Sequence, residues 1–417
     1  MKARIHRGAS EVGGSTVELE AGGQRLVLDV GLPLSPSKVR YRDLLPDVPG
    51  LWAEGDGSLL GVLVSHGHLD HCGLADLVRP EIPVFMSEAG RRVLEQAAFY
   101  NTRWQPPKQT RSLPLDCSFD LGPFRITTFR VDHSAYDSRA FLIEAAGKRL
   151  VYSGDLRAHG RKSGWLENLI KVASGSDCLL LEGTNVGREV ALERNSSMQD
   201  ELAVEERCSE LFAHHEGLAL AFFSAQNTDR LVSVRNAARR AGRHLILDLY
   251  ANDLAKATND PTVPSAMDDG VRVYVTESQR RRVLRSGEFD RVNYLGRSRI
   301  FRDEIAEDPG RWVMLTRNSM LGELARDQCL VGARSVWMSW PGYLEPEFGS
   351  SGQELAQQGL SPEFVHTSGH ARVFDLQCLA TALAPDRVIP IHTNEPNAYA
   401  DLFEGVEVKD DNEWWEV

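Results

Sequence analysis

Short apolar segments spread along the chain lead into histidine or acidic residues. Residues 62–64 run into the sequence Ser-His-Gly-His-Leu-Asp-His at positions 65–71, and five other segments end in similar residues. These are 26–28 with Asp29, 129–131 with Asp132 and His133, 150–154 with Asp155, 179–181 with Glu182, and 388–391 with His392. Strands that each finish in a polar residue gather those residues at one edge of a sheet. We therefore expect an α/β fold with a site at its strand ends.

The segment at residues 66–71 contains three histidines and one aspartate. Imidazole and carboxylate are ligands that suit Zn²⁺, and neutral histidine and ionised aspartate bind it at neutral pH with little proton release. A lone histidine is most often a structural residue, but four such side chains at one strand end are costly to bury without a metal. We expect His66 and His68 to face one ion, and Asp70 and His71 to face a second.

The pattern along the chain predicts a domain with an insertion. The chain has 417 residues, enough for more than one domain. Its first part alternates short strands with turns and includes a helix at 69–78, whereas the middle part alternates helices with strands, which is typical of a parallel α/β domain. We expect residues 1–184 and 356–417 to form one domain and 185–355 the inserted one. In the last segment we expect strands at 363–368, 387–393 and 406–410, and an acidic surface tail from residue 400.

Charge restricts how the chain could bind a polyanion. Lys and Arg number 47 against 59 Asp and Glu, a net charge of −12, so basic contacts must be local. Residues 272–302 hold nine arginines and three acids, and residues 230–243 hold five arginines and no acid. Both segments could contact a phosphate backbone. For 230–243 an ordinary helix C-terminus is an equally good interpretation.

Neither a membrane location nor secretion is expected. No apolar run approaches the roughly 20 residues that a membrane span needs. The N-terminal residues lack the apolar core of a secretory signal, and the six cysteines form no C-x-x-C pair. We therefore expect free thiols and a cytoplasmic protein.

The H-x-H-x-D-H motif at residues 66–71 resembles that of the metallo-β-lactamase superfamily. The long interval between Asp155 and His392 is similar to the insertion in the β-CASP nucleic-acid-processing group of that superfamily. Glu182, His370 in HTSGHA and His392 in PIHTN would be the extra motifs of this group. HTSGHA and the opening HRGASEVGGSTVELE most resemble ribonuclease J and its archaeal relatives. The resemblance implies a metallo-β-lactamase αββα sandwich with an inserted β-CASP α/β domain.

The resemblance also implies a set of metal ligands. It assigns two zinc ions per chain, held by His66, His68 and His133 on one side and by Asp70, His71 and His392 on the other, with Asp155 bridging. Asp29, which fits a turn residue equally well, would accept an N–H from a ligating imidazole and fix its tautomer.

The remaining site residues follow from the same resemblance. Asp70, His370 and Glu182 would be the catalytic residues, with His370 as the general acid kept protonated by Glu182. For His370, a loop hydrogen bond is the alternative role. Relatives that degrade RNA from the 5′ end hold a terminal phosphate with the matching loop, and here the candidates are Ser224, His366, Ser368 and Gly369.

The expected activity is zinc-dependent hydrolysis of phosphodiester bonds in single-stranded RNA. We expect a 5′→3′ exonuclease that prefers 5′-monophosphate ends, with endonuclease activity as an additional mode. A DNA-directed nuclease of the same group, a metallo-hydrolase of small esters and an inactive scaffold in an RNA-processing complex remain alternatives. The chain ends at Val417, shortly after His392, so we expect no counterpart of the C-terminal domain of bacterial ribonuclease J. Whether the chain forms a homodimer is left open.

Overall fold

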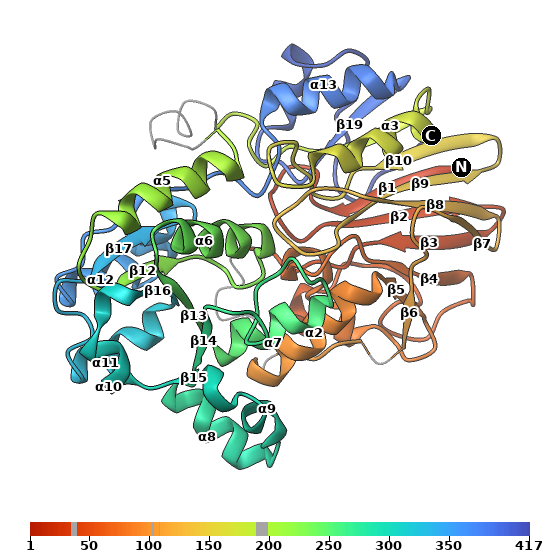
Figure 1. Cartoon of the computed structure of the whole chain (residues 1–417). Helices are drawn as coiled ribbons and strands as arrows, with labels where there is room; N and C mark the ends of the chain where they lie inside the picture. The colour runs from red at the N-terminus through yellow and green to blue at the C-terminus, as the bar shows by residue number, and fades with distance from the viewer. Residues whose placement is uncertain (35–39, 102–103, 108, 189–198) are drawn as a thin grey trace. The chain divides into compact units, whose positions relative to one another are not determined.

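The computed structural model describes residues 1–34, 40–101, 104–107, 109–188 and 199–417 (Figure 1). The chain forms two compact units, one made of Met1–Val190 and Gly369–Val417 and the other of Ala191–Ser368. The chain thus returns from the second unit to the first after residue 368, later than the expected boundary at residue 355. The reason is that β18 (Glu363–Phe364) pairs in parallel with β17 (Arg334–Trp337), in the sheet of the second unit.

The first unit contains two sheets with helices on their outer faces. One sheet has the order β20-β1-β2-β3-β4-β5-β6 and the other β19-β11-β10-β9-β8-β7. The strands of the first sheet are β1 (Lys2–Arg7), β2 (Thr16–Ala21), β3 (Gln24–Leu28), β4 (Leu59–Leu63), β5 (Val84–Met86), β6 (Thr110–Ser112) and β20 (Trp414–Glu416). Those of the second are β7 (Ser118–Leu121), β8 (Phe124–Arg130), β9 (Arg139–Ala145), β10 (Lys148–Tyr152), β11 (Cys178–Glu182) and β19 (Arg387–Ile391).

Successive side chains of each strand point to opposite faces of the sheet, which produces three apolar layers in this unit. Leu26 and Leu28 of β3 pack with Phe141 and Ile143 of β9 in the core between the two sheets, whereas Val27 faces the opposite side of its sheet. That outer side is covered by α2 (Glu88–Tyr100), and the outer side of the second sheet by α3 (Leu166–Ala173) and α13 (Val373–Leu383) (Figure 1). The layers are helix, sheet, sheet and helix, which confirms the predicted αββα sandwich.

The second unit is a parallel α/β domain, as predicted. Its sheet has the order β15-β14-β13-β16-β12-β17-β18, and its neighbouring strands all pair in parallel. The other strands are β12 (Ala219–Phe222), β13 (His244–Asp248), β14 (Val271–Tyr274), β15 (Arg299–Ile300) and β16 (Trp312–Thr316). The helices are α5 (Glu201–Ala213), α6 (Thr228–Arg240), α7 (Leu249–Thr258), α8 (Glu277–Ser286), α9 (Asp290–Asn293), α10 (Arg302–Glu307), α11 (Asn318–Arg326) and α12 (Ser351–Gln357).

Short helices complete the described structure. α1 (Leu69–Cys72) is shorter than the predicted helix at 69–78, because the chain continues from it into a separate turn of 3₁₀ helix at Ala75–Leu77. The 3₁₀ helices are η1 (Tyr41–Leu44), η2 (Ala75–Leu77), η3 (Ser163–Trp165), η4 (Gly296–Ser298), η5 (Pro309–Arg311), η6 (Pro341–Leu344), η7 (Pro346–Phe348) and η8 (Pro396–Asp401). In the part of the chain that is described, no helix is both long and apolar enough to cross a membrane.

The C-terminal tail differs from its prediction. The expected strand at 406–410 is reduced to a single bridge between Val406 and Val388, and the expected surface tail instead ends in β20. β20 pairs with β1, and Trp415 and Val417 lie in the core between the sheets. Glu416 lies between these two apolar residues, and further acids precede them, so the net charge of the tail hid its buried face.

Candidate metal centre

The sheets bring the site residues together at the carboxyl ends of parallel strands. β3 and β4 are parallel neighbours, so Asp29 lies beside the loop that leads from β4 to α1. β10, β11 and β19 are likewise parallel neighbours, so Glu182 lies at the end of its strand and Asp155 and His392 follow the ends of the adjacent strands. Asp29 and His392 have left-handed backbone conformations, with φ of 56° and 53°. Such strain in a residue other than glycine is typical of functional sites.

Asp155 is shared by three groups of side chains that could hold metal ions. The groups are His66, His68, His133 and Asp155; Asp70, His71, Asp155 and His392; and Asp155, Glu182 and His370. Within each group the candidate ligand atoms all lie within 4.8 Å of one another. From Asp155 Oδ2, the Nε2 atoms of His71, His66, His392 and His133 are 3.1, 3.6, 3.7 and 3.8 Å away, respectively. The structure therefore brings together all seven residues that were expected to bind metal.

The chemistry of these buried atoms fits divalent metal ions. The Nε2 atoms of His66, His71 and His392 and both carboxylate oxygens of Asp155 have no hydrogen-bond partner among the described residues. Buried polar atoms without partners are rare in folded proteins, because losing water without compensation is costly. Burial, with the neighbouring His71, lowers the pKa of His66 well below its usual value, which favours the neutral imidazole that metals bind. These side chains therefore fit a metal centre in which the groups of ligands share Asp155.

Hydrogen bonds around Asp29 orient His71. The Asp29 carboxylate accepts hydrogen bonds of 2.7 Å from Ser65 N, Ser65 Oγ and the Tyr152 hydroxyl. His71 Nδ1 lies 2.7 Å from the same carboxylate, which leaves Nε2 toward Asp155. A carboxylate behind a histidine fixes the tautomer and ring orientation that a metal requires. Tyr152 is the last residue of β10 and follows apolar residues, so the sequence did not indicate that its hydroxyl would contact the site.

The sequence did not predict two further sets of contacts that hold metal-type residues or their neighbours in place. Ser15 Oγ lies 2.8 Å from Nδ1 of His392, and Ser15 is fully buried. The Asp132 carboxylate accepts from Arg157 Nε at 2.9 Å and from Lys162 N at 2.8 Å, and Asp132 immediately precedes His133. These residues are far from their partners in the sequence, and Ser15 and Arg157 are not residue types that bind metal, so only the fold reveals their contacts.

His370 lies beside Glu182 at the edge of this cluster. His370 Nδ1 is 3.3 Å from Glu182 Oε1 and 3.7 Å from Asp155 Oδ2. Burial lowers the pKa of His370, but the Glu182 and Asp155 carboxylates outweigh it and raise the pKa to about 9. Glu182 is itself fixed by backbone N–H groups, at 3.3 Å from Leu156 and 3.0 Å from Thr184. The role of His370 as a proton donor stays a prediction.

The four residues expected to hold a terminal phosphate are divided between the units. Ser224 is exposed after β12, and His366 and Ser368 follow β18, all in the second unit. His366 Nδ1 lies 3.1 Å from the Met338 carbonyl oxygen. Gly369 belongs to the first unit, where an added Cβ would come within 2.6 Å of Ser134 Oγ, so a larger residue would need a shift. Their role in phosphate binding stays a prediction.

The basic segment at 230–243 fits the alternative interpretation, an ordinary helix C-terminus, better than a phosphate-binding patch. Arg239 and Arg240 lie in the last turn of α6, and two other arginines of the segment are buried inside the second unit. Arg230 is fully buried, 2.9 Å from Glu201, and donates to the carbonyl of Thr367. Arg243 donates to the carbonyl of Gly217 at 2.9 Å. These guanidinium groups satisfy buried carbonyls and one buried carboxylate, which fixes them within the fold.

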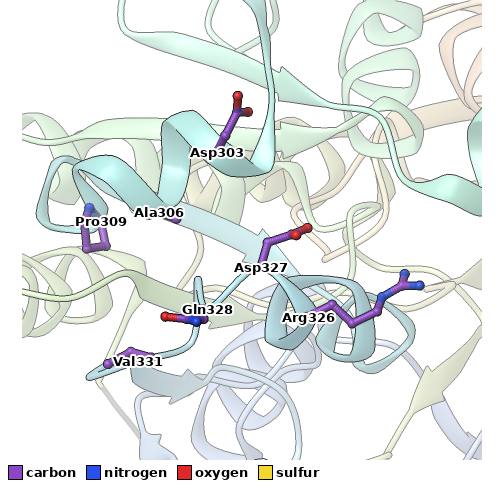
Figure 2. A pocket seen from close by; sticks show the side chains of 7 residues that line it. All are labelled: Asp303, Ala306, Pro309, Arg326, Asp327, Gln328 and Val331. Carbon is purple, nitrogen blue, oxygen red and sulfur yellow. The ribbon is translucent and has the colours of Figure 1, made fainter.

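A cavity of about 610 Å³ also lies in the second unit. Figure 2 shows its lining residues, which come from the α10 and α11 region. They are Asp303, Ala306, Pro309, Arg326, Asp327, Gln328 and Val331. None of them belongs to the metal-type groups found in the described part of the chain.

Residues 40–208 match the model of the family described as "Beta-lactamase superfamily domain". The crystal structure of a protein of unknown function from Enterococcus faecalis V583 is similar over 99% of both chains, with a TM-score of 0.78 and 18% sequence identity. The first unit thus contains a segment similar to the beta-lactamase superfamily domain, and the second unit is a parallel α/β domain inserted into the first.

Over most of its length, the chain is similar to ribonuclease J. It is 26% identical over 389 residues to ribonuclease J of Sinorhizobium meliloti, which covers 88% of this chain and 64% of that protein. It is 20% identical over 410 residues to ribonuclease J of Mycoplasma genitalium, covering 92% of this chain and 66% of that protein. The chain thus spans about two thirds of the length of these relatives.

Proposed function

We propose that the protein is a two-zinc ribonuclease. The observation that carries the proposal is Asp155, whose buried carboxylate lies between two groups of histidine and aspartate ligands. His66, His68 and His133 would hold one ion, Asp70, His71 and His392 the other, and Asp155 would contact both. When bound, two such ions lower the pKa of water and stabilise the charge that develops on a phosphoryl group.

The residues of the chain itself would position and protonate the reacting groups. Water attacks phosphorus in line, the bond from phosphorus to the 3′ oxygen breaks, and the products carry a 5′ phosphate and a 3′ hydroxyl. His370 would donate its proton to the departing 3′ oxygen from Nε2, since Nδ1 lies against Glu182. Glu182 would hold His370 in place and keep it protonated. Asp70, on the first turn of α1, would complete the catalytic residues together with this pair.

The proposed substrate is single-stranded RNA, and the proposed mode is 5′→3′ removal of nucleotides from 5′-monophosphate ends, with internal cleavage as an additional mode. The name of the curated relatives supports RNA. Ser224, His366, Ser368 and Gly369 are the proposed contacts of the terminal phosphate, through hydroxyl, imidazole and backbone N–H groups. The six cysteines are all free thiols, which supports the proposed cytoplasmic location.

The test uses one RNA labelled at its 5′ or 3′ end, with a matched single-stranded DNA and parallel reactions containing a chelator. RNAs with 5′-monophosphate, 5′-triphosphate and 5′-hydroxyl ends are compared. We expect a labelled mononucleotide to be released at once from the 5′-labelled monophosphate RNA, and no cleavage with the chelator. Early internal fragments from both labels, insensitive to the 5′ group, would refute the exonuclease mode. Cleavage of DNA alone, or activity only on small esters, would refute the ribonuclease.

A further inference from the structure

The second unit has an arginine-rich helix face. α8 contains four arginines and one acid. Arg280, Arg281 and Arg285 are exposed, and no described residue forms an ion pair with any of them. The acid, Glu277, is already engaged by Arg302 at 3.3 Å. This face therefore carries uncompensated positive charge in a chain whose net charge is −12.

Exposed apolar and aromatic side chains accompany these arginines. Leu284, which is 54% exposed, shares a face of α8 with Arg281, because residues three positions apart in a helix are neighbours. Phe289 follows the helix and is 47% exposed. Phe301 follows β15 and is 49% exposed, and the Arg299 guanidinium lies 4.7 Å from the centre of its ring. Figure 1 shows α8 and α9 beside β15, the edge strand of the sheet.

Local helix stability does not explain this composition. Arg285 lies in the last turn of α8, where a cation is favoured by the helix dipole. Arg280 and Arg281 lie in the middle of α8, beyond the first turn, where the helix dipole has little effect on a cation. The helix is already stabilised by a capping box formed by Thr276 and Gln279. Arg280 and Arg281 thus contribute little to helix stability through the dipole, so their exposed charges are available to a binding partner.

Arg280, Arg281, Leu284 and Arg285 are here called the α8 face, and we propose that its three arginines bind the phosphate backbone of single-stranded RNA. The inference rests on the proposed function, which makes RNA the substrate. Arginine contacts phosphate through several N–H donors, and exposed rings beside such a surface stack on bases without regard to sequence. Phe289 is the proposed stacking residue. The α8 face gives a long RNA an anchor on a different unit from the metal-type residues.

The test compares two double variants with the same change in charge. Arg281→Glu with Arg285→Glu alters the α8 face, and Arg125→Glu with Arg239→Glu alters two exposed arginines elsewhere that form no ion pair among the described residues. Binding of a fluorescent 30-nucleotide RNA with phosphorothioate linkages, which keep the charge and resist hydrolysis, is measured over a range of salt concentrations. Cleavage of short and long RNAs by the same proteins is measured separately, and circular dichroism checks that each variant is folded.

We expect the α8 variant to bind the long RNA at least about tenfold more weakly and to lower the salt slope by about 1.4, since each lost contact with a single strand removes about 0.7. The control variant should change both quantities much less. Phe289→Ala should weaken binding without changing the salt slope. Equal affinity and slope in the wild type and the α8 variant would overturn the inference, and would leave an acidic protein as the partner of this face. A wild type that binds RNA through the α8 face but does not cleave it would refute the proposed function and not this inference.

Discussion

The carboxylate of Asp155 is common to all three groups of metal-type residues. Its Oδ2 atom lies 3.1 Å from His71 and 3.6 Å from His66, and neither carboxylate oxygen has a hydrogen-bond partner among the described residues. Around it, supporting groups fix the imidazoles: Asp29 with Tyr152 behind His71, and Ser15 behind His392. Individual hydrogen bonds should therefore affect metal affinity, whereas His370 should affect catalysis alone.

The first prediction separates proton donation from metal binding. His370→Ala should lower turnover about 10²- to 10⁴-fold, the usual contribution of a general acid, while the metal content stays unchanged. Metal analysis and RNA cleavage rates on the same preparation measure the two effects. His214→Ala, at the exposed C-terminal end of α5, removes a histidine without touching the site and serves as the control. Turnover within about threefold of the wild type would remove the acid role from His370.

The second prediction concerns the Tyr152 hydroxyl. Tyr152→Phe keeps the ring and removes the hydrogen bond of 2.7 Å to Asp29, so His71 becomes less firmly oriented. We expect metal affinity to fall by about 10-fold, at the lower end of the range for groups that support a ligand. Competition with a chromophoric chelator measures this change.

Tyr399→Phe is the matched control for this variant. Tyr399 is also fully buried in the first unit, but its hydroxyl donates to the Leu181 carbonyl at 3.1 Å. Its loss should leave metal affinity nearly unchanged. Equal losses of affinity in both variants would show that general stability, and not the orientation of His71, accounts for the effect.

The metal-type residues lie at or near strand ends, and contacts within the sheets hold those strands in place. Glu18 of β2 joins the sheet internally: its carboxylate lies 2.6 Å from Arg4 of β1, 2.6 Å from Arg25 of β3 and 2.8 Å from His6 of β1. Burial raises the pKa of Glu18, but the hydrogen bonds from His6, Arg4 and Arg25 outweigh it and lower the pKa to about 2. The ionised Glu18 therefore stabilises the folded protein.

The third prediction follows from the sign of this shift. A carboxyl group whose pKa is lower when folded adds stability above its unfolded pKa of about 4.5, and that stability is lost as the pH falls toward about 2. Glu18→Gln should cost about 3 kcal/mol of unfolding free energy at pH 7 and about 1 kcal/mol at pH 3. Denaturant unfolding at both pH values measures this. Glu20→Gln, on the same strand but partly exposed, is the control. A cost that is equal at both pH values would contradict the linkage.

The sequence predicted the strands that lead into the site better than the elements that frame it. Strands such as β11, with five buried residues in Cys178–Glu182, combine an apolar run with a ligand-type end and were recognised. β20 was missed because three residues, two of them tryptophan, lie within an acidic stretch. The sequence could not decide between the two interpretations of residues 230–243, because charge counts do not reveal that Arg230 is buried against Glu201. Contacts between distant residues, such as that of Ser15 with His392, have no local pattern.

On the scale of the whole molecule, each unit has a hydrophobic core of its own, and the second unit is an insertion between Glu182 and His370. The H-x-H-x-D-H motif and the long interval before His392 were enough to predict this organisation. The exact point of return to the first unit was not predicted, because the expected strand at 363–368 could belong to either unit. Only the pairing of β18 with β17 assigns it to the second. The first unit thus supplies every residue expected to bind metal, and the second supplies the proposed RNA-binding face.

The proposed function requires that the groups around Asp155 hold two metal ions on which cleavage of RNA depends. The most direct test is elemental analysis of the purified protein, combined with RNA cleavage by the same sample before and after chelation. We expect about two transition-metal ions per chain, mostly zinc, loss of activity on their removal, and joint loss of metal and activity in His68→Ala. Full activity in protein that contains no bound metal would contradict the account.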